Sequence, residues 1–138
     1  MTYNRTNNRN GFTLIEIVIA IAIVGFMMAA ATIAFNTLRK MGQKRSAESS
    51  LRAIQTAINT YKLSVGLYPN SLKELTEKPS DPKAAQRWPG ALLEKEPEDP
   101  WHEPFHYEKT SGKQHPYELY TEGDPDDADR QRIDVWNI

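Results

Sequence analysis

The sequence predicts an α+β fold in which one long N-terminal helix packs on a small antiparallel-sheet head. Three observations predict this fold. An apolar run extends from Phe12 to Phe35, an apolar stripe at helical spacing follows up to Val65, and strand-like alternation appears only after Gly66. The chain of 138 residues has room for one domain and an appendage. It contains no cysteine, which excludes a disulfide framework and a thiolate metal site.

Residues 12–35 are predicted to form a transmembrane helix. Only Thr13, Glu16 and Thr32 are polar within this run. A helix of this length measures about 36 Å and crosses a hydrocarbon core of about 30 Å. The run is too long for a secretory signal peptide, whose apolar core has about 7–15 residues. Glu16 is costly in lipid and needs a partner, and we expect none nearby in this chain.

Residues 36–65 are predicted to continue the same helix into the head as an amphipathic segment. No proline occurs before Pro69, and Gly66 is a natural place for the helix to end. Apolar residues recur every three or four positions, which places them on one helical face. These residues are Ala47, Leu51, Ile54, Ile58, Tyr61 and Val65.

Residues 66–138 are predicted to form the globular α+β head. Ser71 and Glu74 have the spacing of a capping box that opens a short helix. Five prolines within residues 78–100 predict an irregular loop with at most one helical turn. Alternating patterns predict strands within residues 104–109 and 116–121 and a last short strand within residues 132–138.

The N-terminal residues resemble a prepilin signal. A short basic leader ends in Gly11 and is followed by "FTLIEIVIAIAIVG". This pattern is similar to that of type IV pilins and of the pseudopilins of type II secretion. The resemblance implies that a prepilin peptidase removes residues 1–11 by cutting between Gly11 and Phe12, and then methylates Phe12. It also implies that Glu16 pairs with the amine of Phe12 on a neighbouring subunit.

The head resembles that of the major pseudopilins of type II secretion. The segments that carry this likeness are "AINTYKLSVGLYP", "DPWHEPFHY" and "YELYTEGDPDD" with the closing "IDVWN". The resemblance implies a type IV pilin-like fold and no enzymatic activity. It implies a single-pass inner-membrane protein with a periplasmic head, which assembles into a helical homopolymer that drives secretion of folded proteins across the outer membrane. The implied partners are the peptidase, an inner-membrane assembly platform and minor pseudopilins.

Two other functions remain open at this point. One is a pilin of a type IV or competence filament, which serves adhesion or DNA uptake; the other is a monomeric, membrane-tethered binding domain. After residue 65 the chain has sixteen acidic and nine basic residues. Because nucleic-acid binding depends on basic surfaces, we expect no nucleic-acid partner.

An acidic loop near the C-terminus is a candidate metal site. Its spacing does not fit an EF-hand, but the resemblance implies a calcium ion in this loop. Three alternatives stay open: a calcium site, neutralisation by Arg130 and Arg132, or an unstructured acidic surface. The best candidates for calcium ligands are Asp126 and Asp127, followed by Asp124 and Asp129.

The segment "HEPFH" fits the HExxH pattern of zinc proteases. That chemistry requires a helix that places His102 and His106 on one face. Pro104 lies between them and disfavours a helix. We therefore expect no zinc catalysis and no catalytic residue.

Overall fold

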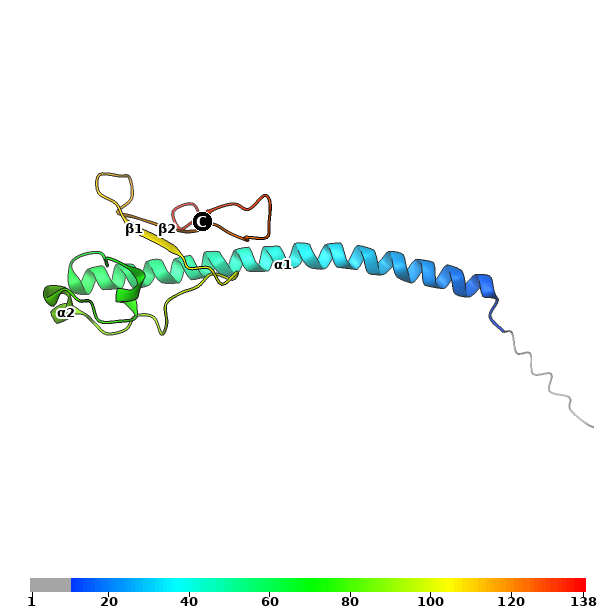
Figure 1. Cartoon of the computed structure of the whole chain (residues 1–138), viewed down its shortest axis with the longest axis horizontal. Helices are drawn as coiled ribbons and strands as arrows, with labels where there is room; N and C mark the ends of the chain where they lie inside the picture. The colour runs from blue at the N-terminus through cyan, green and yellow to red at the C-terminus, as the bar shows by residue number, and fades with distance from the viewer. Residues whose placement is uncertain (1–10) are drawn as a thin grey trace, which may run out of the picture. The chain divides into compact units, whose positions relative to one another are not determined.

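The computed structural model describes residues 11–138, so the first ten residues of the predicted leader lie outside the described residues. The order of elements is helix α1, 3₁₀ helix η1, helix α2 and strands β1, β2 and β3. Figure 1 labels α1, α2, β1 and β2. The chain divides into two compact units. The first unit ends at Arg39, and the second, the head unit, comprises Lys40–Ile138.

Helix α1 extends from Leu14 to Val65 without interruption. It begins two residues later than the apolar run, because Thr13 takes the position before the helix and caps it. Its end at Val65, directly before Gly66, confirms the sequence prediction. Every large apolar side chain from Phe12 to Met41 is at least 48% exposed, with Ile17 the least exposed.

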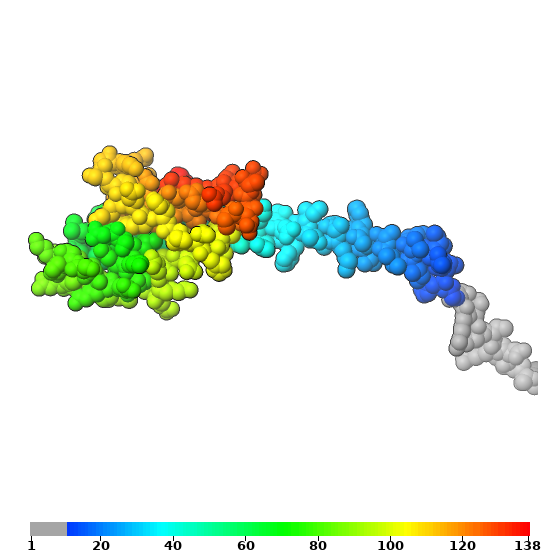
Figure 2. Space-filling model, viewed as in Figure 1, coloured from blue at the N-terminus to red at the C-terminus, as the bar shows by residue number. Residues whose placement is uncertain are grey.

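The core of the head unit lies along one face of α1. All six residues of the predicted stripe are buried, together with Ala57. They pack in one cluster with Leu72, Leu75, Phe105, Leu119 and other residues from the loops and the sheet. In Figure 2 the atoms of residues after about 66 lie over this part of the chain. The amphipathic pattern of this segment therefore reflects packing within the head, because the apolar side chains are buried by the rest of the same chain.

The sheet has three antiparallel strands in the order β1-β2-β3. β1 (His106–Lys109) pairs with β2 (Tyr117–Thr121), and β2 pairs with β3 (Ile133–Asp134). Tyr117, Leu119 and Thr121 are buried and alternate along β2 with partly exposed residues. One face of the central strand thus packs on the core, as the alternation predicted.

Two local predictions were wrong. The helix at Ser71 is the 3₁₀ helix η1 (Leu72–Leu75), and the Ser71 side chain does not cap it. The Glu74 carboxylate accepts hydrogen bonds from Tyr61 Oη (2.7 Å) and Asn70 N (3.1 Å) instead of closing a capping box. The proline-rich loop contains α2 (Pro82–Arg87), which is longer than the single turn expected.

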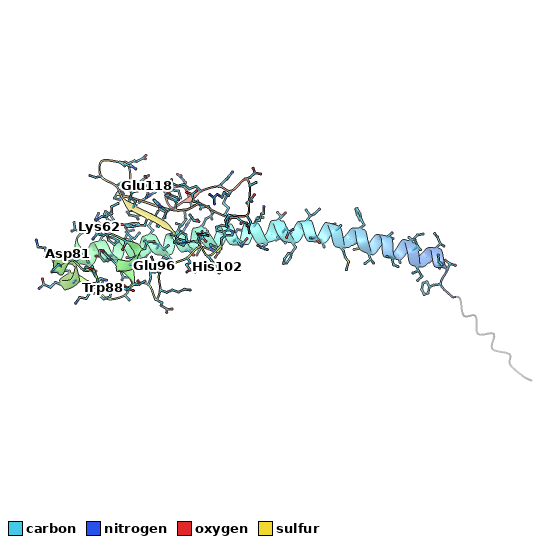
Figure 3. All side chains as sticks on the ribbon, in the orientation of Figure 1. Lys62, Asp81, Trp88, Glu96, His102 and Glu118 are labelled. Carbon is cyan, nitrogen blue, oxygen red and sulfur yellow. The ribbon has the colours of Figure 1, made fainter. Side chains whose placement is uncertain are left out.

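Local sequence explains why α2 forms. Asp81 precedes it, and Asp81 Oδ2 accepts a hydrogen bond from Ala84 N at 3.0 Å. Pro82 stands at the first helical position, where its missing N–H costs nothing. The loop after α2 is fixed to η1, because Trp88 Nε1 donates to Glu74 O at 3.0 Å. Figure 3 shows Asp81 and Trp88 in this part of the head.

Candidate functional site

The first candidate site is the start of α1. Gly11 and Phe12 precede the helix, and Phe12 is 83% exposed. Glu16 Oε2 accepts hydrogen bonds from Thr13 N and Thr13 Oγ1, both at 2.9 Å. Glu16 N donates in return to Thr13 Oγ1 at 3.3 Å. Thr13 and Glu16 therefore form a reciprocal capping box.

This capping box corrects the sequence analysis, which found no partner near Glu16. The signal was present, because a threonine followed three residues later by a glutamate, just before an apolar run, is the signature of a capping box. Thr13 satisfies one carboxylate oxygen with neutral donors. Within residues 11–138, no basic side chain forms an ion pair with Glu16. The negative charge is thus oriented but not neutralised by this part of the chain.

The apolar surface behind Glu16 is the second feature of this site. Among the described residues, α1 is the one helix long and apolar enough to cross a membrane. The apolar window within it has no residue buried inside the chain. Thr32 and Thr37 donate their hydroxyl hydrogens to the carbonyls of Met28 and Ile33, so these two polar groups are satisfied within the helix. Such a surface is suited to lipid or to other apolar helices.

The second candidate site is the acidic loop between β2 and β3. The backbone closes on itself at Gly123, where an added Cβ would lie 2.8 Å from Gln131 O. Asp124 Oδ1 accepts a hydrogen bond from Asp126 N (3.0 Å), and Asp127 Oδ1 accepts one from Asp129 N (3.2 Å). Two of the four aspartates therefore use a side-chain oxygen to hold the loop's own backbone.

Lys40 of α1 reaches this loop. Lys40 Nζ donates to Asp127 Oδ2 at 2.8 Å, and both side chains are partly exposed. This hydrogen bond lowers the pKa of Asp127 and raises the pKa of Lys40. The negative charges of Asp124 and Asp129 raise the pKa of Lys40 further. Lys40 is thus paired with Asp127 and lies in the field of two further aspartates.

The two arginines that follow the loop do not take the role that the sequence suggested. Arg132 donates to Asp134 at 2.8 Å, lies 3.8 Å from Glu118, and stacks over the ring of Tyr120. Arg130 forms no ion pair with any residue that the structure describes. Figure 3 marks Glu118, which also pairs with Lys113 at 2.7 Å. The expected pairing of the aspartates with Arg130 and Arg132 is therefore not present, and the basic side chain that pairs with the loop is Lys40.

The donor set of the loop does not fit calcium as it is arranged here. Calcium takes six to eight oxygen ligands. Within residues 11–138, no group of three histidine, aspartate or glutamate side chains converges on one point where it could hold a metal ion. Asp124 and Asp127 each turn one carboxylate oxygen to the backbone, and Asp127 gives its other oxygen to Lys40. The candidate ligands Asp124, Asp126, Asp127 and Asp129 are thus neighbours in the loop without forming a cage.

The HEPFH segment has no helical geometry. His102 has a φ of 67° in a turn, and His106 begins strand β1. Pro104 pairs with Glu98 in an isolated antiparallel bridge. His102 Nδ1 lies 4.0 Å from Glu98 Oε2, whereas His106 Nε2 lies 3.9 Å from Glu108 Oε2. The two histidines therefore belong to different local structures, as Pro104 suggested.

Sequence reasoning missed a buried carboxylate that organises this part of the head. Asp99 is 4% exposed, and its Oδ1 accepts hydrogen bonds from Trp101 N and Glu103 N, both at 2.9 Å. Thr121 Oγ1, at the end of β2, donates to Asp99 Oδ2. The only signal in the sequence was the Asp-Pro-Trp segment at residue 99, since its partner Thr121 follows far along the chain. Asp99 thus ties this turn to the strand that leads into the acidic loop.

The fold and the N-terminal site define a class of protein. A capped, exposed apolar helix that continues into an α+β head is the architecture of a pilin-like protein. The family model "Prokaryotic N-terminal methylation motif" matches residues 6–32. The family model "Type II secretion system (T2SS), protein G" matches residues 35–136.

Curated relatives agree with this assignment. The type II secretion system core protein G of Pseudomonas aeruginosa is 31% identical over 119 residues, which cover 83% of each chain. That of Dickeya chrysanthemi is 27% identical over 136 residues, which cover 94% of this chain and 88% of the relative. The chain belongs to the protein G family of the type II secretion system and is a structural subunit of the secretion pseudopilus.

A solved structure confirms the fold. The crystal structure of the major pseudopilin from the type 2 secretion system of enterohaemorrhagic Escherichia coli matches with a TM-score of 0.57 at 21% identity. The match covers 74% of this chain and 93% of the pseudopilin. This match confirms the predicted type IV pilin-like α+β fold. The family model and the curated relatives confirm the predicted pseudopilin function.

Proposed function

We propose that this pseudopilin is made as a precursor, that a prepilin peptidase cuts it between Gly11 and Phe12, and that the amine of Phe12 is then methylated. The position of this bond supports the proposal. Gly11 and Phe12 are exposed and precede the first helical residue, Leu14, so the bond is not protected by helical hydrogen bonds. The match to the methylation motif spans the same region.

Glu16 then directs assembly by binding the methylated amine of Phe12 on a neighbouring subunit. Thr13 binds Oε2, whereas Oε1 accepts no hydrogen bond from residues 11–138. A carboxylate enclosed by apolar helices is strongly unfavourable unless a cation is matched to it. Only one axial register matches every carboxylate to an amine, so the pair selects that register.

One observation carries the proposed mechanism: an exposed apolar helix surface that bears a single carboxylate near its start. Residues 12–35 anchor the subunit in the inner membrane, with the head in the periplasm. An assembly platform transfers the subunit into a helical homopolymer, in which the helices of other copies replace lipid around this surface. Minor pseudopilins join the same filament, and its growth drives folded proteins across the outer membrane. No step requires catalysis by this chain.

The first experiment is an intact-mass measurement on protein extracted from its native membrane. Loss of residues 1–11 and gain of one methyl group is the expected result. A full-length, unmethylated mass would contradict the processing step.

A matched pair of variants separates processing from assembly. Glu16→Gln keeps the size of the side chain and its bonds to Thr13 but removes the charge. We expect normal maturation and loss of pseudopili in the sheared fraction. Glu16→Asp, which keeps the charge on a shorter side chain, serves as control and retains part of the assembly. If the Gln variant assembled like the wild type, the charge pairing would be wrong.

A further inference from the structure

The C-terminal loop is paired with a cation of the same chain. The relevant residues lie within the head unit, where Lys40 of α1 and Asp127 of the loop are 87 positions apart in the sequence. We propose that the ammonium group of Lys40 replaces a divalent metal ion as the counter-ion of the loop from Gly123 to Arg132. This protein would then hold its C-terminal loop on α1 without calcium. The inference concerns the stability of the head and does not depend on the proposed assembly mechanism.

The arrangement of the loop oxygens is the first argument. Asp127 uses both of its carboxylate oxygens, one for Asp129 N and the other for Lys40 Nζ. Asp124 Oδ1 is bound to Asp126 N. Two backbone hydrogen bonds add to the closure of the loop, from Asp127 N to Asp124 O and from Arg130 N to Asp127 O. A calcium ion that took Asp127 Oδ2 as a ligand would have to displace the ammonium group of Lys40, and it would need further oxygens to complete its six to eight ligands.

The distribution of positive charge is the second argument. Arg132 is held by Asp134 and Tyr120 and forms no ion pair with any of the four aspartates. Lys40 and Lys44 of α1 line a cavity of about 380 Å³, together with Asp124, Asp127 and Asp129 of the loop. The three aspartates would attract a divalent ion into this cavity, but the positive charges of Lys40 and Lys44, and of Arg130 and Arg132, which also line it, oppose that attraction. The cation that pairs with Asp127 is covalently part of α1 and is not lost on dilution.

The proposal predicts that opening of the loop depends on ionic strength and not on the calcium concentration. A calcium-bound loop opens when free calcium falls below the dissociation constant. The bond from Lys40 to Asp127 responds instead to ionic strength, because both side chains are partly exposed. The loop leads into β3 and the C-terminal residues, so its attachment to α1 also affects how stably the C-terminus is held in the head.

Hydrogen exchange of the full-length protein in detergent tests this proposal. The amides of Asp126, Asp127, Asp129 and Arg130 report opening of the loop, since each donates a hydrogen bond within it. In the wild type we expect the same exchange rates, within about twofold, in EGTA and in about 5 mM calcium, which exceeds the dissociation constants of weak extracellular sites. Protection that rises with calcium, but not with magnesium or sodium chloride of equal ionic strength, would overturn the proposal.

A matched pair of lysine variants gives a second, independent readout. Lys40→Gln removes the ammonium group that binds Asp127. Lys44→Gln removes the same charge one turn later on α1, from a side chain that forms no ion pair with any described residue. In EGTA we expect Lys40→Gln to speed exchange in the loop by roughly 3–10-fold, because a local contact that limits opening is lost. Lys44→Gln should change it by less than about twofold. Equal effects of the two variants would overturn the specific role of Lys40.

Discussion

Two segments of α1 differ in what surrounds their apolar side chains. From Phe12 to Met41 the large apolar side chains are exposed, whereas from Ala47 to Val65 those on one face of the helix are enclosed by the head. Both segments belong to one uninterrupted helix, so the difference lies in what covers the side chains. The enclosed segment is stabilised by its own chain. The exposed segment requires lipid or further subunits to cover it.

Core truncation should separate the two segments most clearly. Leu51 is fully buried in the head, whereas Ile19 is 51% exposed in the apolar half of α1. Leu51→Ala should destabilise the head by about 2–5 kcal/mol, because it removes apolar contacts and leaves a cavity. The matched variant Ile19→Ala should leave the unfolding midpoint of the head unchanged and reduce the yield of pseudopili. Thermal unfolding in detergent and quantification of sheared filaments measure the two effects. Equal unfolding midpoints for the two variants would contradict the claim that only the second segment of α1 stabilises the head.

The closure of the acidic loop gives the next largest effect. Gly123 has a φ of 83°, and a Cβ there would lie 2.8 Å from Gln131 O. Gly123→Ala should cost more than about 2 kcal/mol, since backbone strain and the steric clash add together. Gly112→Ala is the control, because its φ is 75° but nothing lies within 4 Å of the added Cβ. It should cost only the strain of about 1–2 kcal/mol. If both variants unfolded at the same denaturant concentration, the contact with Gln131 would be irrelevant.

The elements whose signals are local were predictable from the sequence. The stripe from Ala47 to Val65 follows helical period, and the absence of proline before Pro69 permits one helix. The alternation in β2 likewise reflects one buried face. The capping-box signature gave one missed and one wrong prediction. At Thr13 a real capping box was overlooked, whereas at Ser71 an expected one does not form, because Tyr61 and Asn70 bind the Glu74 carboxylate.

Contacts between residues far apart in sequence were not predictable. The bond between Lys40 and Asp127 depends on where the loop lies against α1, which no local pattern encodes. For the same reason the sequence suggested Arg130 and Arg132, the nearest basic residues, as partners of the loop. The buried position of Asp99 depends on Thr121, which reaches it only once β2 is in the sheet. In each case tertiary packing decides between polar partners that the sequence offers equally.

The smallest expected change in stability concerns Tyr61, near the end of the buried apolar stripe of α1. Tyr61 Oη donates to Glu74 Oε2 at 2.7 Å, and burial together with this bond raises the pKa of Tyr61 well above 10.0. Because the folded-state pKa is the higher one, the contribution of Tyr61 is complete below pH 10 and is lost as the pH rises toward the folded pKa. Tyr61→Phe should cost about 1 kcal/mol at pH 7, since Glu74 keeps its bonds to Asn70 and is not left without a partner. In a head of this size, that corresponds to a fall of about 4–8 °C in the unfolding midpoint.

A comparison of midpoints at pH 7 and above pH 10 tests the sign of this linkage. The difference between wild type and Tyr61→Phe should shrink at alkaline pH, because ionised tyrosine no longer donates to Glu74. A difference that grows with pH would contradict the assigned direction of the pKa shift. Leu63→Ala is a suitable control, because Leu63 is 87% exposed on the same part of α1. It should leave the midpoint of the head unchanged, which places the effect of Tyr61 in the enclosed face of the helix.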